Sequence, residues 1–217
     1  MYSVSEENYI KAIYHLQKQG KTVSTNELAE RMQTKPASVT DMLKKLYNKD
    51  LLEYQPYHGV NLSPSGSKIA LNIIRRHRLW EFFLVNTIGF QWDEVHDIAE
   101  ELEHIQHPGL IDKLDDFLGK PTFDPHGDPI PDKNGEIAEV KYRLLTEADK
   151  GEKVFFSSVG LQTHELMNML KHKKIALGDS IEILEKFDFD QSLDVFINNT
   201  SQVSLSYRLA RYILIPA

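Results

Sequence analysis

Apolar residues recur at helical spacing along the first third of the chain. Three helices are predicted there, over residues 5–19, 23–32 and 37–52, and a turn at residues 33–36 separates the last two. The third helix turns an apolar face inward, formed by Val39, Met42, Leu43 and Leu46. Two short strands joined by a turn at Tyr57–Gly59 follow. Three helices and a β-hairpin in this order predict a winged helix-turn-helix.

The pattern changes at Ser65, where a long helix begins and runs to Gly89. Its apolar residues are too numerous for one narrow face, so we expect burial on two sides, against its own domain and against a second subunit. A further helical stretch runs from Trp92 to Gln106 and ends before Pro108. A short amphipathic helix follows over residues 110–119.

The last third of the chain predicts β-structure. Residues 119–135 are rich in Pro, Gly and Asp, which predicts a structured loop, and a linker is expected to run on to about Asp149. Short alternating segments then predict a small β-barrel of about five strands with one inserted helix. The predicted fold is mainly α with a small all-β C-terminal domain. Its expected parts are a DNA-binding domain (1–64), a helical dimerisation and metal-binding domain (65–140), a linker (141–150) and the barrel (151–217).

Charge divides the chain in the same way. Residues 1–80 hold 12 Lys and Arg against 7 Asp and Glu, a net +5, whereas residues 81–217 hold 13 against 25, a net −12. A basic N-terminal part on an acidic body predicts a polyanion partner at one end, and double-stranded DNA suits a winged helix. A winged-helix interaction module that binds no DNA is the alternative. The expected DNA-contacting residues are Lys35, Pro36, Ala37, Ser38, Thr40, Lys44, Lys45, Tyr57 and His58.

Composition limits the remaining chemistry. The chain has no cysteine, which excludes disulfides, iron–sulfur clusters and cysteine-type zinc sites, so any metal must be held by oxygen and imidazole nitrogen. No run of 18 apolar residues and no signal-peptide pattern occurs, so we expect a cytoplasmic protein with no membrane partner.

One segment, HDIAEELEHIQH from His96 to His107, carries candidate metal ligands. Glu100, Glu103 and His104 are spaced i, i+3, i+4, which places them on one face of a helix, and His96 lies one turn upstream. Two carboxylates and an imidazole on one patch favour a divalent metal, although a solvated helix face has the same pattern. His77 and Glu81 form a second i, i+4 pair. His77 in its basic RRHR run could instead contact phosphate, and Glu81 could pair with a neighbouring arginine.

A winged helix followed by RHRLWEFFL, VHDIAEELEH and DPHGDPIP resembles the diphtheria-toxin-repressor/manganese-transport-regulator family. The resemblance covers essentially the whole chain, and the C-terminal part resembles the family's SH3-like domain. It implies a homodimeric, metal-activated transcriptional repressor of metal-uptake genes.

The resemblance also implies two metal sites. One would use Glu100, Glu103 and His104, with Asn8 from the first helix and His77 in manganese-type members. The other would use His77, Glu81 and His96 with help from the C-terminal domain, where His164 and Glu165 are the candidates. Mn(II) or Fe(II) is the expected metal, with Zn(II), Co(II), Ni(II) or Cd(II) binding in a test tube.

Three positions depart from the family patterns. Glu100 stands where similar iron-type members place Cys or Met, which favours the manganese type. Asn8 stands where the manganese type has Asp, so its neutral oxygen should weaken the site or alter its selectivity. Lys11 stands where the manganese type has Glu, which argues against a paired manganese cluster of that design.

Two other functions compete. A winged-helix regulator could sense an organic ligand, with the His/Glu stripe as a polar surface. A carboxylate-bridged di-iron enzyme needs the element E-x-x-H twice, and this chain carries it once, at Glu101–His104, so we expect no enzyme and no small-molecule substrate. A metal joining the first helix to the 96–106 helix would set the spacing of two recognition helices in a dimer. The operator should therefore be a palindrome.

Overall fold

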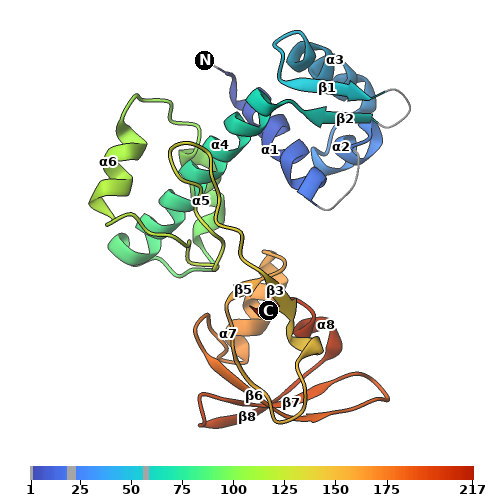
Figure 1. Cartoon of the computed structure of the whole chain (residues 1–217), viewed down its shortest axis with the longest axis vertical. Helices are drawn as coiled ribbons and strands as arrows, with labels where there is room; N and C mark the ends of the chain where they lie inside the picture. The colour runs from blue at the N-terminus through green and yellow to red at the C-terminus, as the bar shows by residue number, and fades with distance from the viewer. Residues whose placement is uncertain (1, 19–22, 56–58) are drawn as a thin grey trace. The chain divides into compact units, whose positions relative to one another are not determined.

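The computed structural model describes residues 2–18, 23–55 and 59–217 of the chain (Figure 1). These residues form two compact units. Unit 1 comprises residues 1–80, 97–121 and 130–137, and unit 2 comprises residues 81–96, 122–129 and 138–217. Among the described residues, no helix is long and apolar enough to cross a membrane.

The N-terminal part of unit 1 has the predicted order of three helices and a hairpin. The elements are α1 (Val4–Lys18), α2 (Thr25–Arg31), α3 (Pro36–Tyr47), β1 (Leu52–Gln55) and β2 (Gly59–Leu62). A capping box begins each of the first two helices, because Ser3 pairs with Glu6 and Ser24 pairs with Glu27. The antiparallel hairpin pairs Leu52 with Leu62. The helices bury one shared core whose fully enclosed side chains include Ile10, Ile13, Leu28, Val39 and Leu46.

A buried carboxylate joins α1 to the end of α3. Glu6 is 2% exposed and binds Lys49 Nζ at 2.5 Å and Lys45 Nζ at 3.3 Å. Burial opposes the negative charge, but the hydrogen bond from Lys49, the backbone N–H of Ser3 and the contact with Lys45 outweigh it. They hold the pKa of Glu6 at about 2. Lys45 and Lys49 therefore fix the recognition helix as well as adding positive charge.

Three further helices follow the hairpin. They are α4 (Pro64–Phe83), α5 (Val95–Leu102) and α6 (Leu110–Phe117), and the π-helical turn η1 (Leu84–Ile88) extends α4 up to Gly89, as predicted. Arg75 on α4 is buried and bonds to Asp112 at 3.0 Å and to Asp115 at 2.8 Å, which fixes α6 against α4 within unit 1. The prediction for α5 was too long, because α5 ends at Leu102 and Glu103 and His104 lie in the turn after it.

The two larger sheets belong to unit 2. A three-stranded sheet has the order β3-β9-β5, formed by Tyr142–Leu144, Ile213–Pro216 and Ser158–Val159. A four-stranded sheet has the order β4-β6-β7-β8, formed by Lys153–Phe155, Ser180–Lys186, Leu193–Ile197 and Ser201–Leu205. Helix α7 (His164–His172) lies where one helix was predicted, and its apolar face joins the core at Leu166, Met167 and Leu170.

The structure corrects the sequence prediction in two places here. Seven strands form in the described part of unit 2, where about five were expected, and a short helix α8 (Tyr207–Ala210) precedes the last strand. Residues within the expected linker instead form β3 and a 3₁₀ turn, η2 (Leu145–Glu147), with Leu145 fully buried. The register Tyr142↔Pro216 shows why: β3 pairs with the far end of the chain.

Candidate metal centre

Unit 1 brings together candidate ligands from two helices and the turn that follows. His77 comes from α4, Glu100 from α5 and Glu103 from the turn that ends α5, while Asn8 lies on α1. The backbone N–H of Glu103 still donates to Ala99 O at 2.9 Å, so Glu103 keeps the helical register that its spacing predicted. Its side chain is fully buried. A buried carboxylate requires a positive partner or hydrogen-bond donors, and the surrounding side chains supply them.

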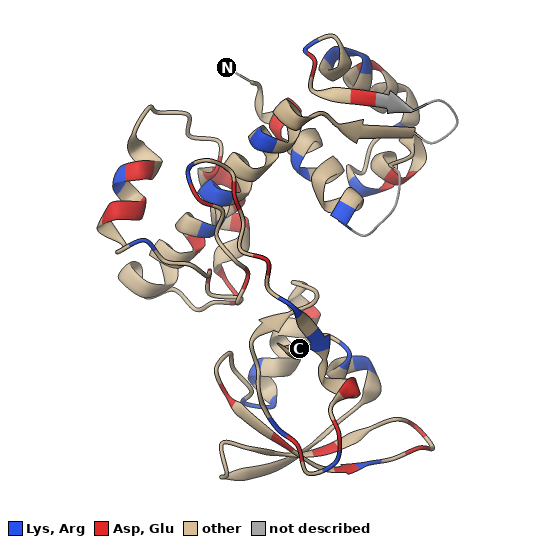
Figure 2. Ribbon diagram, viewed as in Figure 1, with Lys and Arg blue, Asp and Glu red and all other residues tan. Residues whose placement is uncertain are grey.

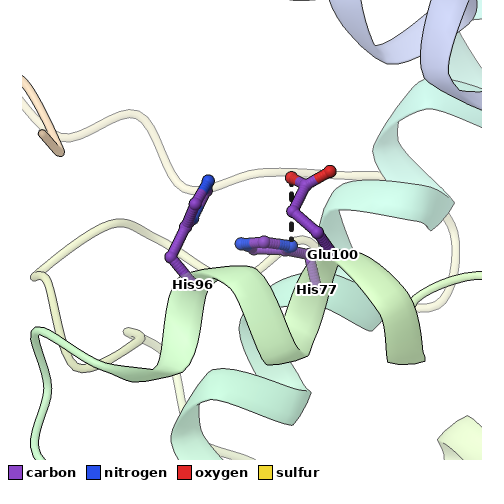
Figure 3. A group of neighbouring side chains, drawn as sticks. All are labelled: His77, His96 and Glu100. Atoms are coloured by element: carbon purple, nitrogen blue, oxygen red, sulfur yellow. Dashed lines mark ion pairs between the residues drawn. The ribbon is translucent and has the colours of Figure 1, made fainter.

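One partner is Lys11, an amine that the sequence places on α1. Its Nζ binds Glu100 Oε1 and lies 2.7 Å from Glu103 Oε2. His77 Nδ1 lies 2.7 Å from the same Glu103 oxygen and 3.6 Å from Glu100 Oε1, and the latter pair is the dashed contact in Figure 3. Figure 3 also shows His96, one turn before Glu100 on α5. The structure thus brings three predicted ligands of unit 1 (His77, Glu100 and Glu103) to one point, with an ammonium among them.

His104 faces a different carboxylate. Its Nδ1 lies 2.6 Å from Glu7 Oε2, and Glu7 Oε1 accepts bonds from Arg76 at 2.7 Å and from Gln106 at 3.0 Å. A carboxylate anchored by two donors only accepts, so Nδ1 of His104 carries its proton and Nε2 presents a lone pair. The Nε2 atom lies 3.8 Å from Glu103 Oε1. A carboxylate that orients a histidine in this way is the usual support of a metal-binding imidazole.

Among the described residues of unit 1, two buried side-chain oxygen atoms have no hydrogen-bond partner, and both belong to predicted ligands. They are Oδ1 of Asn8 and Oε1 of Glu103. Buried oxygen atoms are almost always satisfied by a donor or a cation. These oxygens and Nε2 of His104 are oxygen and imidazole donors without sulfur, which suits Mn(II) or Fe(II). The chemistry of the residues present therefore fits a divalent metal at Glu103 Oε1 and His104 Nε2, which lie 3.8 Å apart.

Unit 2 contains a second candidate group. Glu81, Asp124 and His126 are buried, and one possible ligand atom from each lies within 4.8 Å of the others. His126 Nδ1 is 3.4 Å from Glu81 Oε2, and His96 Nδ1 is 3.4 Å from Glu81 Oε1. The predicted pair Glu81 and His96 is therefore in contact. Asp124 and His126 come from the loop 122–129.

The protonation of His126 is set by its neighbours. Burial disfavours the charged ring, but the hydrogen bond and charge of Glu81 outweigh this effect, with smaller contributions from Asp124 and the backbone of Trp92. The pKa of His126 therefore lies above its ordinary value. Its Nε2 is 2.8 Å from the Trp92 carbonyl, which can only accept, so Nε2 carries a proton and Nδ1 is directed to Glu81. Because Nε2 faces this carbonyl, Nδ1 is the ring atom that can bind a metal once it has lost its own proton.

The sequence prediction missed four residues of these groups. Asp124 and His126 stand in the quoted motif DPHGDPIP but were assigned only to a loop, although the motif itself was the available signal. Glu7 precedes Asn8, and nothing in its spacing indicated a contact with His104. Lys11 was recognised as a departure, not as a member of the cluster. His164 and Glu165, the expected ligands from the β-domain, lie exposed at the start of α7. Neither belongs to the group formed by Glu81, Asp124 and His126.

The predicted DNA surface is exposed where it is described. Lys35, Pro36, Ala37, Ser38, Thr40, Lys44 and Lys45 are all exposed on or beside α3, and Figure 2 shows the basic residues of this region. Thr40 Oγ1 donates to the carbonyl of Pro36 at 3.0 Å. The side chain of Lys44 is 71% exposed, whereas Lys45 forms an ion pair with the buried Glu6 at 3.3 Å. Tyr57 and His58 lie outside the described residues.

Comparison with known protein families gives two matches in sequence order. A model described as "Iron dependent repressor, N-terminal DNA binding domain" matches residues 1–60. A second, described as "Iron dependent repressor, metal binding and dimerisation domain", matches residues 63–132. The second match contains every predicted metal ligand except Asn8 and the two candidates on α7.

Individual relatives agree with these matches. The iron-dependent repressor IdeR of Mycobacterium leprae (strain TN) is 31% identical over 155 residues, 68% of this chain and 67% of the relative. The HTH-type transcriptional regulator MntR of Bacillus pumilus (strain SAFR-032) is 35% identical over 118 residues, 54% of this chain and 81% of the relative. A solved manganese-dependent transcriptional repressor in complex with manganese superposes with a TM-score of 0.86 at 32% identity. That match covers 98% of this chain and 99% of the other.

Proposed function

Because this chain belongs to the family of iron- and manganese-dependent transcriptional repressors, we propose that it binds its operator as a homodimer when Mn(II) or Fe(II) is bound. We further propose that it regulates genes of metal uptake, acts in the cytoplasm and catalyses no reaction. The proposed domain limits keep the sequence expectation of 1–64 for DNA binding and 65–140 for dimerisation and metal binding. Residues 141–150 join 151–217 in the β-domain, because they form β3 and η2.

The observation that carries the metal proposal is a pair of buried side-chain oxygen atoms that have no hydrogen-bond partner. Asn8 Oδ1 and Glu103 Oε1 lack a hydrogen-bond donor, and His104 Nε2 lies beside Glu103. We assign these three atoms as ligands of one ion in unit 1, with Glu100 and His77 next to them. In unit 2 we assign Glu81, His96, Asp124 and His126 as a second ligand group. An ion bound in either group would supply positive charge to carboxylates that otherwise repel one another.

The ligands in unit 1 lie on separate elements, which makes the cluster suitable for a switch. Asn8 belongs to α1, the first helix of the DNA-binding part, whereas Glu103 and His104 follow α5. Holding Asn8 to Glu103 fixes α1 relative to α5, and α1 packs on α3 in one core. In a twofold dimer this placement sets the separation of the two recognition helices, which must match the turn of DNA. The operator is then a palindrome.

The test compares operator binding with and without metal. DNA affinity should rise at least about 100-fold when Mn(II) or Fe(II) is added to metal-free protein, and a chelator should reverse the rise. Fluorescence anisotropy with a labelled operator, found by selection from a random DNA pool, measures both. Binding that ignores the chelator would contradict the proposal and favour a regulator controlled by an organic ligand.

Lys44 provides a separate test of the DNA surface. Its side chain is 71% exposed, and its ion pair with the likewise exposed Asp41 is long, at 3.8 Å, so the amine is available to a phosphate. Lys44→Gln should weaken binding to all sequences alike and reduce the salt dependence by about one counterion. Lys45→Gln is less informative, because Lys45 also supports Glu6. Lys153→Gln on β4 is the control and should leave the salt dependence unchanged. A change in sequence preference with Lys44→Gln would show that this lysine faces bases.

A further inference from the structure

The carboxylate of Glu103 has two sides, and only one of them lacks a cation. Oε2 meets Lys11 Nζ at 2.7 Å and His77 Nδ1 at 2.7 Å. Oε1 has no hydrogen-bond partner and lies 3.8 Å from His104 Nε2. A carboxylate placed in this way can bridge two positive centres, one at each oxygen. On the Oε2 side the protein itself supplies that centre.

We propose that Lys11 is a built-in cation that permanently fills one of two cation positions at Glu103, so that the cluster in unit 1 takes a single metal ion at the other. This inference rests on the proposed metal-dependent function. Lys11 closes the half formed by Glu100, Glu103 Oε2 and His77 to metal. The metal position is the half formed by Glu103 Oε1, His104 and Asn8.

The contacts of Lys11 explain why it stays in place. Its side chain is only 12% exposed, and its ammonium binds one oxygen of Glu100 and one oxygen of Glu103. Moving it away would leave Glu103, which is fully buried, without its cation on that side. Removing one partner of a buried ion pair is far more costly than leaving the pair intact. Binding a metal ion therefore costs less free energy at Oε1, because no hydrogen-bond donor has to be displaced there.

The charges of the cluster also favour a single metal ion. Three carboxylates (Glu7, Glu100 and Glu103) face two fixed cations, Lys11 and Arg76. One negative charge remains, and a single divalent ion more than neutralises it. A second divalent ion would have to lie beside the ammonium and be repelled by it. If Lys11 were a glutamate, four carboxylates would face Arg76 alone, and two divalent ions would restore the same balance.

A built-in cation also changes what metal-free protein can do. Lys11 joins α1 to α5 through Glu100 and Glu103 whether or not a metal is present. The two elements are then held together at one point in the metal-free state, and the metal adds the contact through Asn8. Loss of Lys11 should therefore destabilise the metal-free protein.

The experiment counts ions and measures stability, using full-length protein freed of metal. Isothermal titration with Mn(II) should give one more ion per subunit for Lys11→Glu than for wild type. Metal-free Lys11→Met should unfold about 5–10 °C below wild type in a thermal melt. Lys18→Glu and Lys18→Met are matched controls, because Lys18 lies on the same helix, is exposed and contacts only the ring of Tyr14 in the described structure. Both should match wild type in ion number and melting temperature.

Three other results would contradict either this inference or the proposed function. Equal ion numbers in wild type and Lys11→Glu, with Lys11→Glu folded by circular dichroism, would overturn the inference alone. Unchanged metal-free melting of Lys11→Met, combined with Mn(II) binding more than about tenfold tighter, would show that Lys11 merely competes with metal and would also overturn it. A wild-type protein that binds no Mn(II), Fe(II) or Co(II) would refute the proposed function itself.

Discussion

Replacing Glu103 by glutamine should abolish metal-dependent operator binding. Glu103 is fully buried, and its two oxygens face Lys11 on one side and the candidate metal position on the other. Glutamine has nearly the same shape but no charge, and its amide nitrogen would bring N–H groups toward one of two positive centres. We expect Mn(II) affinity at this cluster to fall at least about 100-fold, and the metal-induced gain in DNA affinity to disappear.

The matched control for this change is Glu101→Gln. Glu101 lies two residues earlier on α5 and is exposed, so the same chemical change there should alter neither metal nor DNA binding. Titration calorimetry gives the metal affinity, anisotropy gives the operator affinity, and circular dichroism shows that both variants are folded. A Glu103→Gln protein that still responds to Mn(II) like wild type would mean that the activating ion does not bind at Glu103.

Local rules were enough to predict the winged helix. The Ser3–Glu6 and Ser24–Glu27 capping boxes mark where α1 and α2 begin, and the positions predicted to face inward on α3 are buried or half-buried. Errors arose where distant segments decide. Strand β3 exists because it pairs with β9 about seventy residues later, and no pattern within Tyr142–Leu144 reveals that partner. A pattern of neighbouring residues does not show which distant segment a strand will pair with.

The candidate site was predictable to a similar extent and for similar reasons. Helical spacing and family resemblance placed Glu100, Glu103 and His77 together, and the structure brings them to one point around Lys11. Glu7 was missed because its contact with His104 joins residues nearly a hundred positions apart. Asn8 was identified by the resemblance, and only burial shows that its oxygen has no hydrogen-bond partner.

Gly127→Ala should be among the most damaging single changes in unit 2. Gly127 has φ +82°, and a Cβ added there would lie 1.9 Å from the carbonyl oxygen of Ser157 and 2.9 Å from its carbon. These are backbone atoms, so no rotamer change can relieve the overlap, and the loop 122–129 must move away from Ser157. We expect a loss of about 3–5 kcal/mol in the unfolding free energy of unit 2.

The same movement should separate Asp124 and His126, which lie in the loop, from Glu81 on α4. His126 precedes Gly127 and is held by the Trp92 carbonyl and Glu81, while the Gly127 carbonyl accepts the hydroxyl of Tyr142 at 3.0 Å. Displacing the loop should therefore remove the unit 2 ligand group and lower the Mn(II) number by one, with the unit 1 ion retained.

Gly151→Ala isolates the clash from the backbone strain. Gly151 is also in unit 2 and has the same φ of +82°, but no atom lies within 4 Å of a Cβ added there. Gly151→Ala should lower the unfolding free energy only by the strain of a left-handed alanine, about 1–2 kcal/mol. The number of Mn(II) ions bound per subunit should stay unchanged. Urea unfolding and Mn(II) titration of both variants decide the question. Equal losses in the two would show that the contact of Gly127 with Ser157 does not hold the loop, because strain alone would then account for the effect.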